Sequence, residues 1–224
     1  MSYNLVFDLE ELRERVDEVN PLDARATVDA IKAKLKKYPN LYALSAPQIG
    51  IKERVIVIKY KGDKFKEYIN PRIFKAEDYH LIREKDISSP EKEFISLRPG
   101  KVFIEYQTKD AVPENNVLKG NSAEVFDRLI NYLDGLPLED YGLEVMPGFD
   151  EATEEERQEI INMYLESLKK RHQLIEENIS QDKDARELRD AIRFMAAVEK
   201  GEVKLEPMDA KPKEDENKQV DNVC

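Results

Sequence analysis

Residues 118–141 read LKGNSAEVFDRLINYLDGLPLEDY, and the rest of the chain can be interpreted around them. Apolar residues recur there at intervals of three and four positions: Val125, Phe126, Leu129, Ile130 and Leu133. This spacing predicts an amphipathic helix over 122–133 with one face buried in a core. Ser122 is the expected N-cap, and Gly135 stands just after the helix, where a left-handed residue is common.

Working outward, the segments before this helix alternate between helical and extended patterns. We expect a short strand or helix within 1–20, a helix over 23–37 capped by Asp23, a loop over 41–51, and strands over 54–60, 65–70, 72–86 and 101–110. Pro71 separates the second and third of these extended segments. Short strands that pack on a late helix indicate an α+β fold.

The composition changes after about residue 150. Residues 153–179 predict a long helix opened by a capping box of Thr153 and Glu156, and 182–200 predict a second helix. We therefore expect three parts: a domain over 1–150, a two-helix extension over 151–200, and a polar tail over 201–224 that is disordered unless bound.

The charge and the cysteine content narrow the classes of function. The 224 residues carry a net charge of −11, which disfavours direct binding to nucleic acid. Cys224 is the single cysteine, so no disulfide framework forms within the chain. No long apolar run is present, so we expect no signal peptide, no membrane contact and a cytoplasmic location.

Several segments also carry motif-like patterns in a fixed order. They are ALSAPQIG (43–50), RVIVI (54–58), INP (69–71), EKDISSP (84–90), RP (98–99), VFIEY (102–106) and AEVFDRLINYLDG (123–135). In this order and spacing they resemble the GxGLAAPQxG, EGCLSVP, RPxxVxVxY and ARVFQHExDHLDG motifs of peptide deformylase, the metallohydrolase that removes the formyl group from nascent polypeptides. The resemblance covers roughly residues 12–141 and implies a deformylase-like domain of short antiparallel strands around a central helix, followed by a C-terminal helical extension.

The resemblance also implies a degenerate active site. The position of the family's metal-binding cysteine holds Asp86, and the positions of its two metal-binding histidines hold Arg128 and Tyr132. Leu129 takes the place of the catalytic glutamate, and only Gln48 of the catalytic set remains. Zinc-type sites need nitrogen and sulfur ligands and an open position for water. We therefore expect no metal, no other cofactor and no catalytic residue.

The replacements suggest a substitute for the metal. If the backbone is retained, Asp86 lies beside Arg128, and an ion pair between them, with the Tyr132 hydroxyl nearby, would join strand and helix where the metal once did. The alternative is that each side chain turns to solvent and contributes little.

These features predict a pseudoenzyme that serves as a structural or assembly component of a larger complex. A bacteriophage virion protein is the specific expectation, by analogy with deformylase-like genes in phage genomes. Its location would then be the host cytoplasm or the virion, and its partners would be other protein subunits, bound through the C-terminal helices and tail.

Two alternatives stay open. One is an active or remodelled deformylase-type hydrolase that acts on N-terminal formyl peptides, with a site rebuilt around Asp86, Tyr132 and Gln48. The other is a non-catalytic peptide-binding module in which the old cleft holds an extended chain as an added strand.

Overall fold

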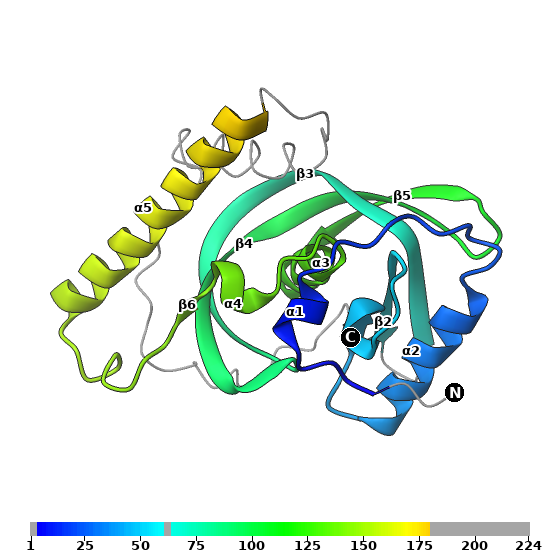
Figure 1. The fold of residues 1–224 in the computed structure, drawn as a ribbon, viewed down its shortest axis with the longest axis horizontal. Coiled ribbons are helices and arrows are strands. Elements are labelled where there is room, and N and C mark those ends of the chain that lie inside the picture. The colour runs from blue at the N-terminus through cyan, green and yellow to red at the C-terminus, as the bar shows by residue number, and fades with distance from the viewer. Residues whose placement is uncertain (1–3, 61–63, 180–224) are drawn as a thin grey trace.

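A central helix, α3 (Asn121–Leu133), runs through the middle of the molecule, and an antiparallel sheet curves around it (Figure 1). The computed structural model describes residues 4–60 and 64–179. The other helices described are α1 (Leu9–Leu12), α2 (Arg25–Lys37), the 3-10 helix η1 (Pro47–Ile49), α4 (Leu138–Tyr141) and α5 (Glu154–Ile179). The strands described are β1 (Ala43–Ser45), β2 (Val55–Tyr60), β3 (Lys64–Asp86), β4 (Ser89–Gln107), β5 (Pro113–Lys119) and β6 (Leu143–Glu144). The predicted α+β class is confirmed.

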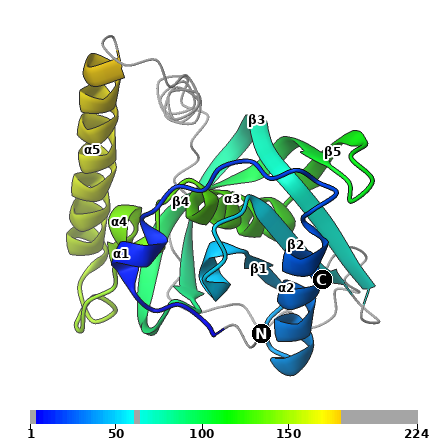
Figure 2. The same cartoon turned by 45° about the vertical axis from the view of Figure 1, so that its right-hand side comes forward.

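The sheet has the order β1-β2-β3-β4-β5, and β6 pairs with β4 outside this path. All of these pairings are antiparallel. A second view shows α2 on the opposite side of β1 and β2 from α3 (Figure 2). The sheet is therefore covered on both faces near β2.

Strand β2 shows why both faces are apolar. Ile56 and Ile58 belong to the core cluster that contains the apolar face of α3, whereas Val55 and Val57 belong to the cluster formed with α2. Alternate residues of a strand point to opposite faces, so a continuous apolar run fits a strand buried on both sides. The predicted strand over 54–60 is confirmed.

The predicted helix over 122–133 is also confirmed, but its expected cap is wrong. The helix starts at Asn121, its N-cap is Gly120 with φ 55°, and no side chain caps it. Asp23 likewise does not cap α2, because the N-cap there is Ala24. Gly135 has the expected left-handed conformation, with φ 73°. A Cβ atom at that position would lie 2.4 Å from the Arg13 carbonyl oxygen, so close packing as well as the turn requires glycine there.

The extended segments before α3 are longer and more continuous than predicted. The strands expected over 65–70 and 72–86 form one strand, β3, that passes through Pro71. The pairing register shifts between Ile69 and Arg72, and a bulge tolerates proline because one ladder hydrogen bond is missing there. Asn70 adopts φ 50° at this point, and its side-chain amide donates to the Val19 carbonyl at 2.8 Å.

Two further differences concern short or polar segments. The expected loop over 41–51 contains β1 and η1, and β5 was not predicted because its sequence, PENNVLK, is mostly polar. Strand β5 forms because it pairs with β4 along Lys101–Gln107. Sheet pairing therefore overrides the weak strand preference of these residues.

The C-terminal part of the described chain is the helix α5, which lies at the side of the body near α4 in both ribbon views (Figure 2). Its predicted capping box is present: the Glu156 amide donates to Thr153 Oγ1 at 3.3 Å, and the Thr153 amide donates to Glu156 Oε2 at 2.8 Å. The helix predicted over 182–200 and the tail over 201–224 lie outside the described residues. The division into 1–150, 151–200 and 201–224 stays a prediction.

Candidate functional site

A cavity of about 380 Å³ opens between the end of β3, one side of α3 and the segment that leads into β1. Among the residues that line it are Tyr42, Ala43, Gln48, Glu84, Asp86 and Arg128. Every element that carries a predicted site residue therefore contributes to one cavity wall or lies directly behind it.

Local geometry explains how the charged residues reach this cavity. Glu84 and Asp86 stand at the end of β3, where the pairing register shifts between them, and both carboxylates lie within 3.5 Å of Arg128. Arg128 lies on the polar flank of α3, next to the apolar face that packs into the core. The end of β3 and this flank of α3 bring opposite charges together from positions more than forty residues apart.

Arg128 contacts both of these carboxylates. Its Nη1 donates to Glu84 Oε2 at 2.7 Å and to the Lys85 carbonyl at 3.3 Å. Its Nε lies 3.5 Å from Asp86 Oδ2, is buried and makes no hydrogen bond with the described residues. Burial works to lower the pKa of Arg128, but the charges of Glu84 and Asp86 outweigh this effect and raise it. Arg128 is a permanent cation in this cavity.

Tyr132 binds the Asp86 oxygen that Arg128 does not face. The Tyr132 hydroxyl donates to Asp86 Oδ1 at 2.7 Å, and the Ser88 amide donates to the same oxygen at 2.8 Å. Tyr132 is fully buried, and burial together with the Asp86 charge raises the pKa of its phenol well above the ordinary value. The hydroxyl therefore stays protonated and acts as a donor.

A second arginine, Arg98 on β4, extends the charged cluster into the interior. Its Nε and Nη2 donate to Glu84 Oε1 at 2.9 and 2.7 Å, and its Nη1 donates to Asp127 Oδ2 at 2.9 Å. Its guanidinium carbon also lies 4.8 Å from the ring centroid of Tyr141, and the Tyr141 hydroxyl is a hydrogen-bond partner. The Arg98 side chain has no solvent exposure. These two hydrogen bonds to one oxygen of Glu84 join β3 to β4.

Glu84 is the shared acceptor of the cluster, with bonds from Arg98, Arg128 and Ser96. Burial works to raise the pKa of Glu84, but the charges of the two arginines and the Ser96 hydrogen bond outweigh it and lower the pKa below the ordinary value. Glu84 is consequently ionised at neutral pH.

The two remaining predicted site residues lie in different surroundings. Gln48 Oε1 accepts hydrogen bonds from the amide and the hydroxyl of Ser45, both at 3.1 Å, and the residue lines the cavity. Leu129 also lines the cavity, but it is only 2% exposed and packs mainly in the core cluster of α3. The structure thus brings Asp86, Arg128 and Tyr132 together, places Gln48 on the same cavity and gives Leu129 a packing role.

The side chains that line this cavity do not fit a divalent metal ion as ligands. The two nearby carboxylates, Glu84 and Asp86, already accept hydrogen bonds, and the Arg128 guanidinium lies between them. Over residues 4–60 and 64–179, no three His, Cys, Asp or Glu side chains are grouped as metal ligands. A cation would have to displace Arg128 and compete with its charge.

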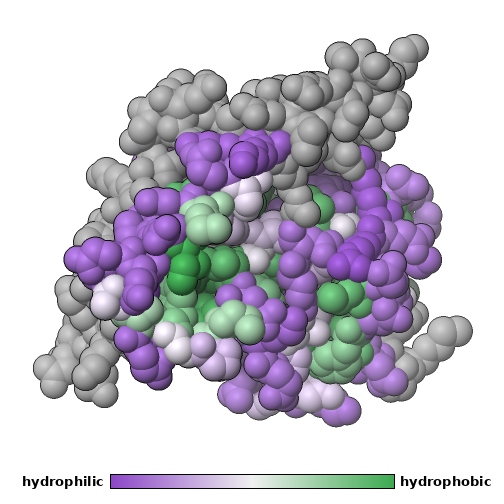
Figure 3. Space-filling view, turned by 60° about the vertical axis from the view of Figure 1, so that its left-hand side comes forward, coloured by the Kyte–Doolittle hydropathy of each residue, from purple (hydrophilic) through white to green (hydrophobic). Residues whose placement is uncertain are grey.

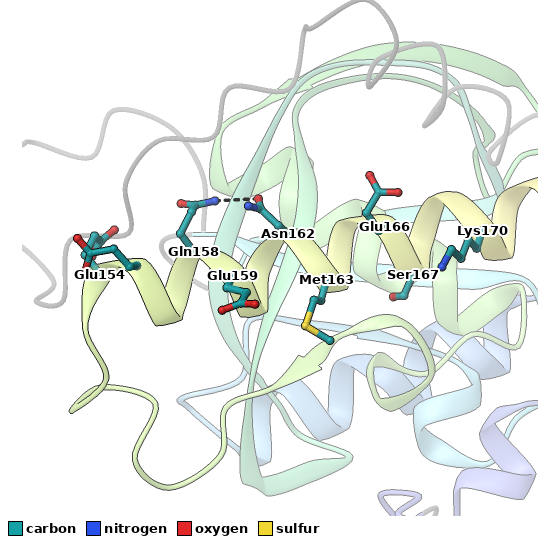
Figure 4. Close-up of a pocket in the computed structure, with 9 residues that line it drawn as sticks. Glu154, Gln158, Glu159, Asn162, Met163, Glu166, Ser167 and Lys170 are labelled. Carbon is teal, nitrogen blue, oxygen red and sulfur yellow. Dashed lines mark hydrogen bonds between the residues drawn. The ribbon is translucent and has the colours of Figure 1, made fainter.

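A second, shallower hollow of about 800 Å³ runs along α5, on the side of the molecule where polar residues surround an apolar patch (Figure 3). Within the described part of the chain its lining comes from α5 only. Met163 and Glu159 project from one side of this helix, whereas Gln158 and Asn162 project from the other and share a hydrogen bond of 3.0 Å (Figure 4). This hollow brings together no group with a recognisable chemistry.

Sequence reasoning missed Glu84 and Arg98 as site residues. Both stand inside the motif segments EKDISSP and RP, so the signal was their presence in those segments. Neither the fourteen-residue separation of these two residues nor their residue types indicated that they would meet. Only the β3–β4 pairing, in which Arg83 faces Ile95 and Glu84 faces Phe94, brings them to one side of the sheet.

The chain is similar to several named proteins. Peptide deformylase 2 from Clostridium acetobutylicum is 30% identical over 129 residues, which are 57% of this chain and 85% of that protein. The crystal structure of peptide deformylase from Thermotoga maritima has a TM-score of 0.57 and 26% identity, and covers 66% of this chain and 99% of that one. The probable peptide deformylase from synechococcus phage S-SSM7 has a TM-score of 0.57 and 28% identity, and covers 62% of this chain and 99% of that one.

These comparisons correct one prediction. The chain was expected not to be an enzyme, but the relatives are named as peptide deformylases, which are enzymes, and none of the names quoted marks an inactive protein. The phage relative is likewise named as a probable deformylase and not as a virion component.

Among the helices described, none is both long and apolar enough to cross a bilayer.

The expected deformylase-like fold is confirmed by the two solved structures, because the match takes in 99% of each of them and 62–66% of this chain. The family model described as Polypeptide deformylase matches residues 5–142, which is more than half of the chain and includes the whole cavity. This chain belongs to the polypeptide deformylase family.

Proposed function

We propose that this chain is a remodelled deformylase-type protein whose ligands are N-terminal formyl peptides. Family membership supports the ligand class. The observation that carries the proposal is the cavity of about 380 Å³, which has a strand edge at one side and, at the other, hydrogen-bond donors with no acceptor among the described residues. An extended peptide with a polar group at its N-terminus matches both sides, because its backbone can pair with the strand edge and its polar group can accept from the donors.

The strand edge is β1, which stands at one end of the sheet and pairs only with β2 among the described strands. Ala43, at its start, and Tyr42, directly before it, line the cavity. Edge strands present backbone amides and carbonyls to which an extended peptide can add as a further strand. This arrangement supports binding of a peptide backbone along β1, directed toward α3.

The polar side of the cavity holds Gln48 and Arg128. Their hydrogen bonds to the described residues use Gln48 Oε1 and Arg128 Nη1, and leave Gln48 Nε2 and Arg128 Nη2 without a protein acceptor there. Donors that face a cavity select ligands with an acceptor oxygen, because an apolar end would leave them unsatisfied. Because the side chains of this cavity do not fit a divalent ion as ligands, we propose no step that uses a metal.

The test is equilibrium binding of an N-formyl-methionyl tripeptide, labelled at its C-terminus, to the full-length protein, followed by fluorescence anisotropy. Two comparison ligands have the same peptide sequence: one has a free N-terminal amino group, and the other has an N-terminal acetyl group. We expect saturable binding with the formylated peptide at least roughly tenfold tighter than either, a difference of about 1.4 kcal/mol. Formate release above the amount of protein would further support the proposal. Absence of binding of the formylated peptide would overturn it.

The predicted structural role in an assembly remains a second proposal, with its own observation. Met163 is 67% exposed and Ile160 is 37% exposed on α5, which lies outside the residues matched to the family. Exposed apolar side chains on a helix are one form of protein contact surface. Sedimentation of the native protein from its source, with mass spectrometry of what co-migrates, tests this role. Migration as a small single species would contradict it, and a complex of fixed stoichiometry would support it.

A further inference from the structure

Arg128 occupies a wall of the cavity with one of its nitrogens fully engaged and another unused. Nη1 binds Glu84 and the Lys85 carbonyl, and Nε faces Asp86. No hydrogen bond from Nη2 is made to the described residues. The guanidinium is planar and rigid, so fixing Nη1 and Nε fixes the direction of the Nη2 donors as well. Arg128 is therefore preorganised to donate to a group in the cavity.

Gln48 is held in a similar way. Its Oε1 accepts from both the amide and the hydroxyl of Ser45, and this pattern of two donors assigns the orientation of the side-chain amide. Nε2 then has no hydrogen-bond acceptor within the described part of the chain, and Gln48 lines the same cavity as Arg128. Two hydrogen-bond donors from different elements, η1 and α3, thus line one cavity.

The charges around Arg128 decide what kind of acceptor fits. Glu84 and Asp86 lie 2.7 and 3.5 Å from nitrogens of Arg128. Glu84 also pairs with Arg98, so the two negative charges balance the positive charges of the two arginines. The cluster therefore has no excess positive charge to attract an anion. A neutral carbonyl oxygen, which needs donors and no counter-charge, fits better than a carboxylate, which two buried carboxylates would repel.

We propose that Arg128 Nη2, with Gln48 Nε2 as the second donor, binds the formyl oxygen of the peptide, so that a fixed guanidinium of this chain makes the contact and no divalent metal is needed. This inference rests on the proposed function and adds the residues that read the formyl group. It also predicts that the free formate ion is held weakly, since formate is an anion.

The test uses the full-length protein after removal of metals with EDTA, and the labelled N-formyl-methionyl tripeptide as the probe. We expect the same affinity before and after EDTA treatment. Arg128→Lys keeps a cation beside Glu84 but removes the forked donors, and Gln48→Glu keeps the acceptor for Ser45 but removes the Nε2 donor. Each variant should bind the formylated peptide roughly tenfold or more weakly, the usual cost of a hydrogen bond lost at a charged or preorganised donor. Binding of the unformylated peptide should change less than about twofold.

The control for charge is Lys85→Gln. The Lys85 side chain is exposed, and its loss removes a positive charge at the cavity rim, whereas the Lys85 backbone carbonyl that binds Arg128 Nη1 stays in place. If Lys85→Gln weakens binding as much as Arg128→Lys does, net charge and not directed donation is responsible, and the inference is wrong. It is also wrong if the wild type prefers the formylated peptide but both donor variants keep that preference, or if EDTA abolishes binding. In these cases the proposed function survives, whereas failure of the wild type to bind any formylated peptide removes both.

Discussion

Truncation of Arg128 to alanine tests whether the charged cluster holds β3 to α3. The change removes the 2.7 Å hydrogen bond to Glu84 and the ion pair at 3.5 Å with Asp86. It leaves both carboxylates in place, with exposed fractions of only 6% for Glu84 and 2% for Asp86. The loss of stability therefore comes largely from buried negative charge that has lost a partner.

The magnitude follows from what each carboxylate retains. Removal of one member of a buried ion pair costs about 3–5 kcal/mol. Glu84 keeps its bonds from Arg98 and Ser96, and Asp86 keeps those from Tyr132 and Ser88, so neither is left without a donor. We therefore expect a loss near the lower end of that range, about 3 kcal/mol in the free energy of unfolding.

The measurement is urea unfolding of the full-length protein at neutral pH, followed by circular dichroism. Arg72→Ala is the matched control, because Arg72 also pairs with two carboxylates, Glu18 and Glu105, but is 38% exposed. Exposed pairs of this kind contribute about 0–1 kcal/mol. If Arg128→Ala costs no more than Arg72→Ala, the cluster does not join the two elements and the reasoning is refuted.

Three further outcomes are expected. Arg98→Ala should cost more than Arg128→Ala, about 4–5 kcal/mol in urea unfolding, because the Arg98 side chain has no exposure; an equal or smaller loss would contradict this. Burial alone would raise the pKa of Glu84, but the two arginines lower it below the unfolded value of 4.5. The stability advantage of the wild type over Glu84→Gln should therefore be complete above pH 4.5 and shrink as the pH falls through the lower folded pKa. An advantage that does not change with pH in urea titrations would oppose this assignment. Gly135→Ala should lower thermal stability more than Gly148→Ala, because both glycines have positive φ but only Gly135 would bring a Cβ atom to 2.4 Å from backbone; equal losses would show that the contact relaxes.

The sequence predicted well those elements whose signal is local. The apolar periodicity of α3, the continuous apolar run of β2 and the capping box of α5 each depend on residues within one or two turns or one strand. The ordered motif segments also predicted the family, because several short patterns at compatible spacing are more specific than any one of them.

Elements that depend on distant partners were predicted poorly. β5 is a polar segment that becomes a strand by pairing with β4, and β3 continues through Pro71 because a bulge at Asn70 lets the chain pass. The caps of α2 and α3 were also misassigned, because Ser122 and Asp23 are suitable cap residues at positions that the backbone does not use as caps. Tertiary context decides these cases and overrides local preference.

The site divides along the same line. The sequence by itself determined that Arg128 would bring a permanent charge, and its resemblance to the family predicted that Asp86, Arg128, Tyr132 and Leu129 stand in place of the metal ligands and base, which stays a prediction. Only the tertiary structure decided that Glu84, and not Asp86, is the principal acceptor for Arg128, and that Arg98 completes the cluster from another strand. The physical reason is that a charge network depends on distances and burial between elements far apart in the chain, and these are set by sheet register and helix packing.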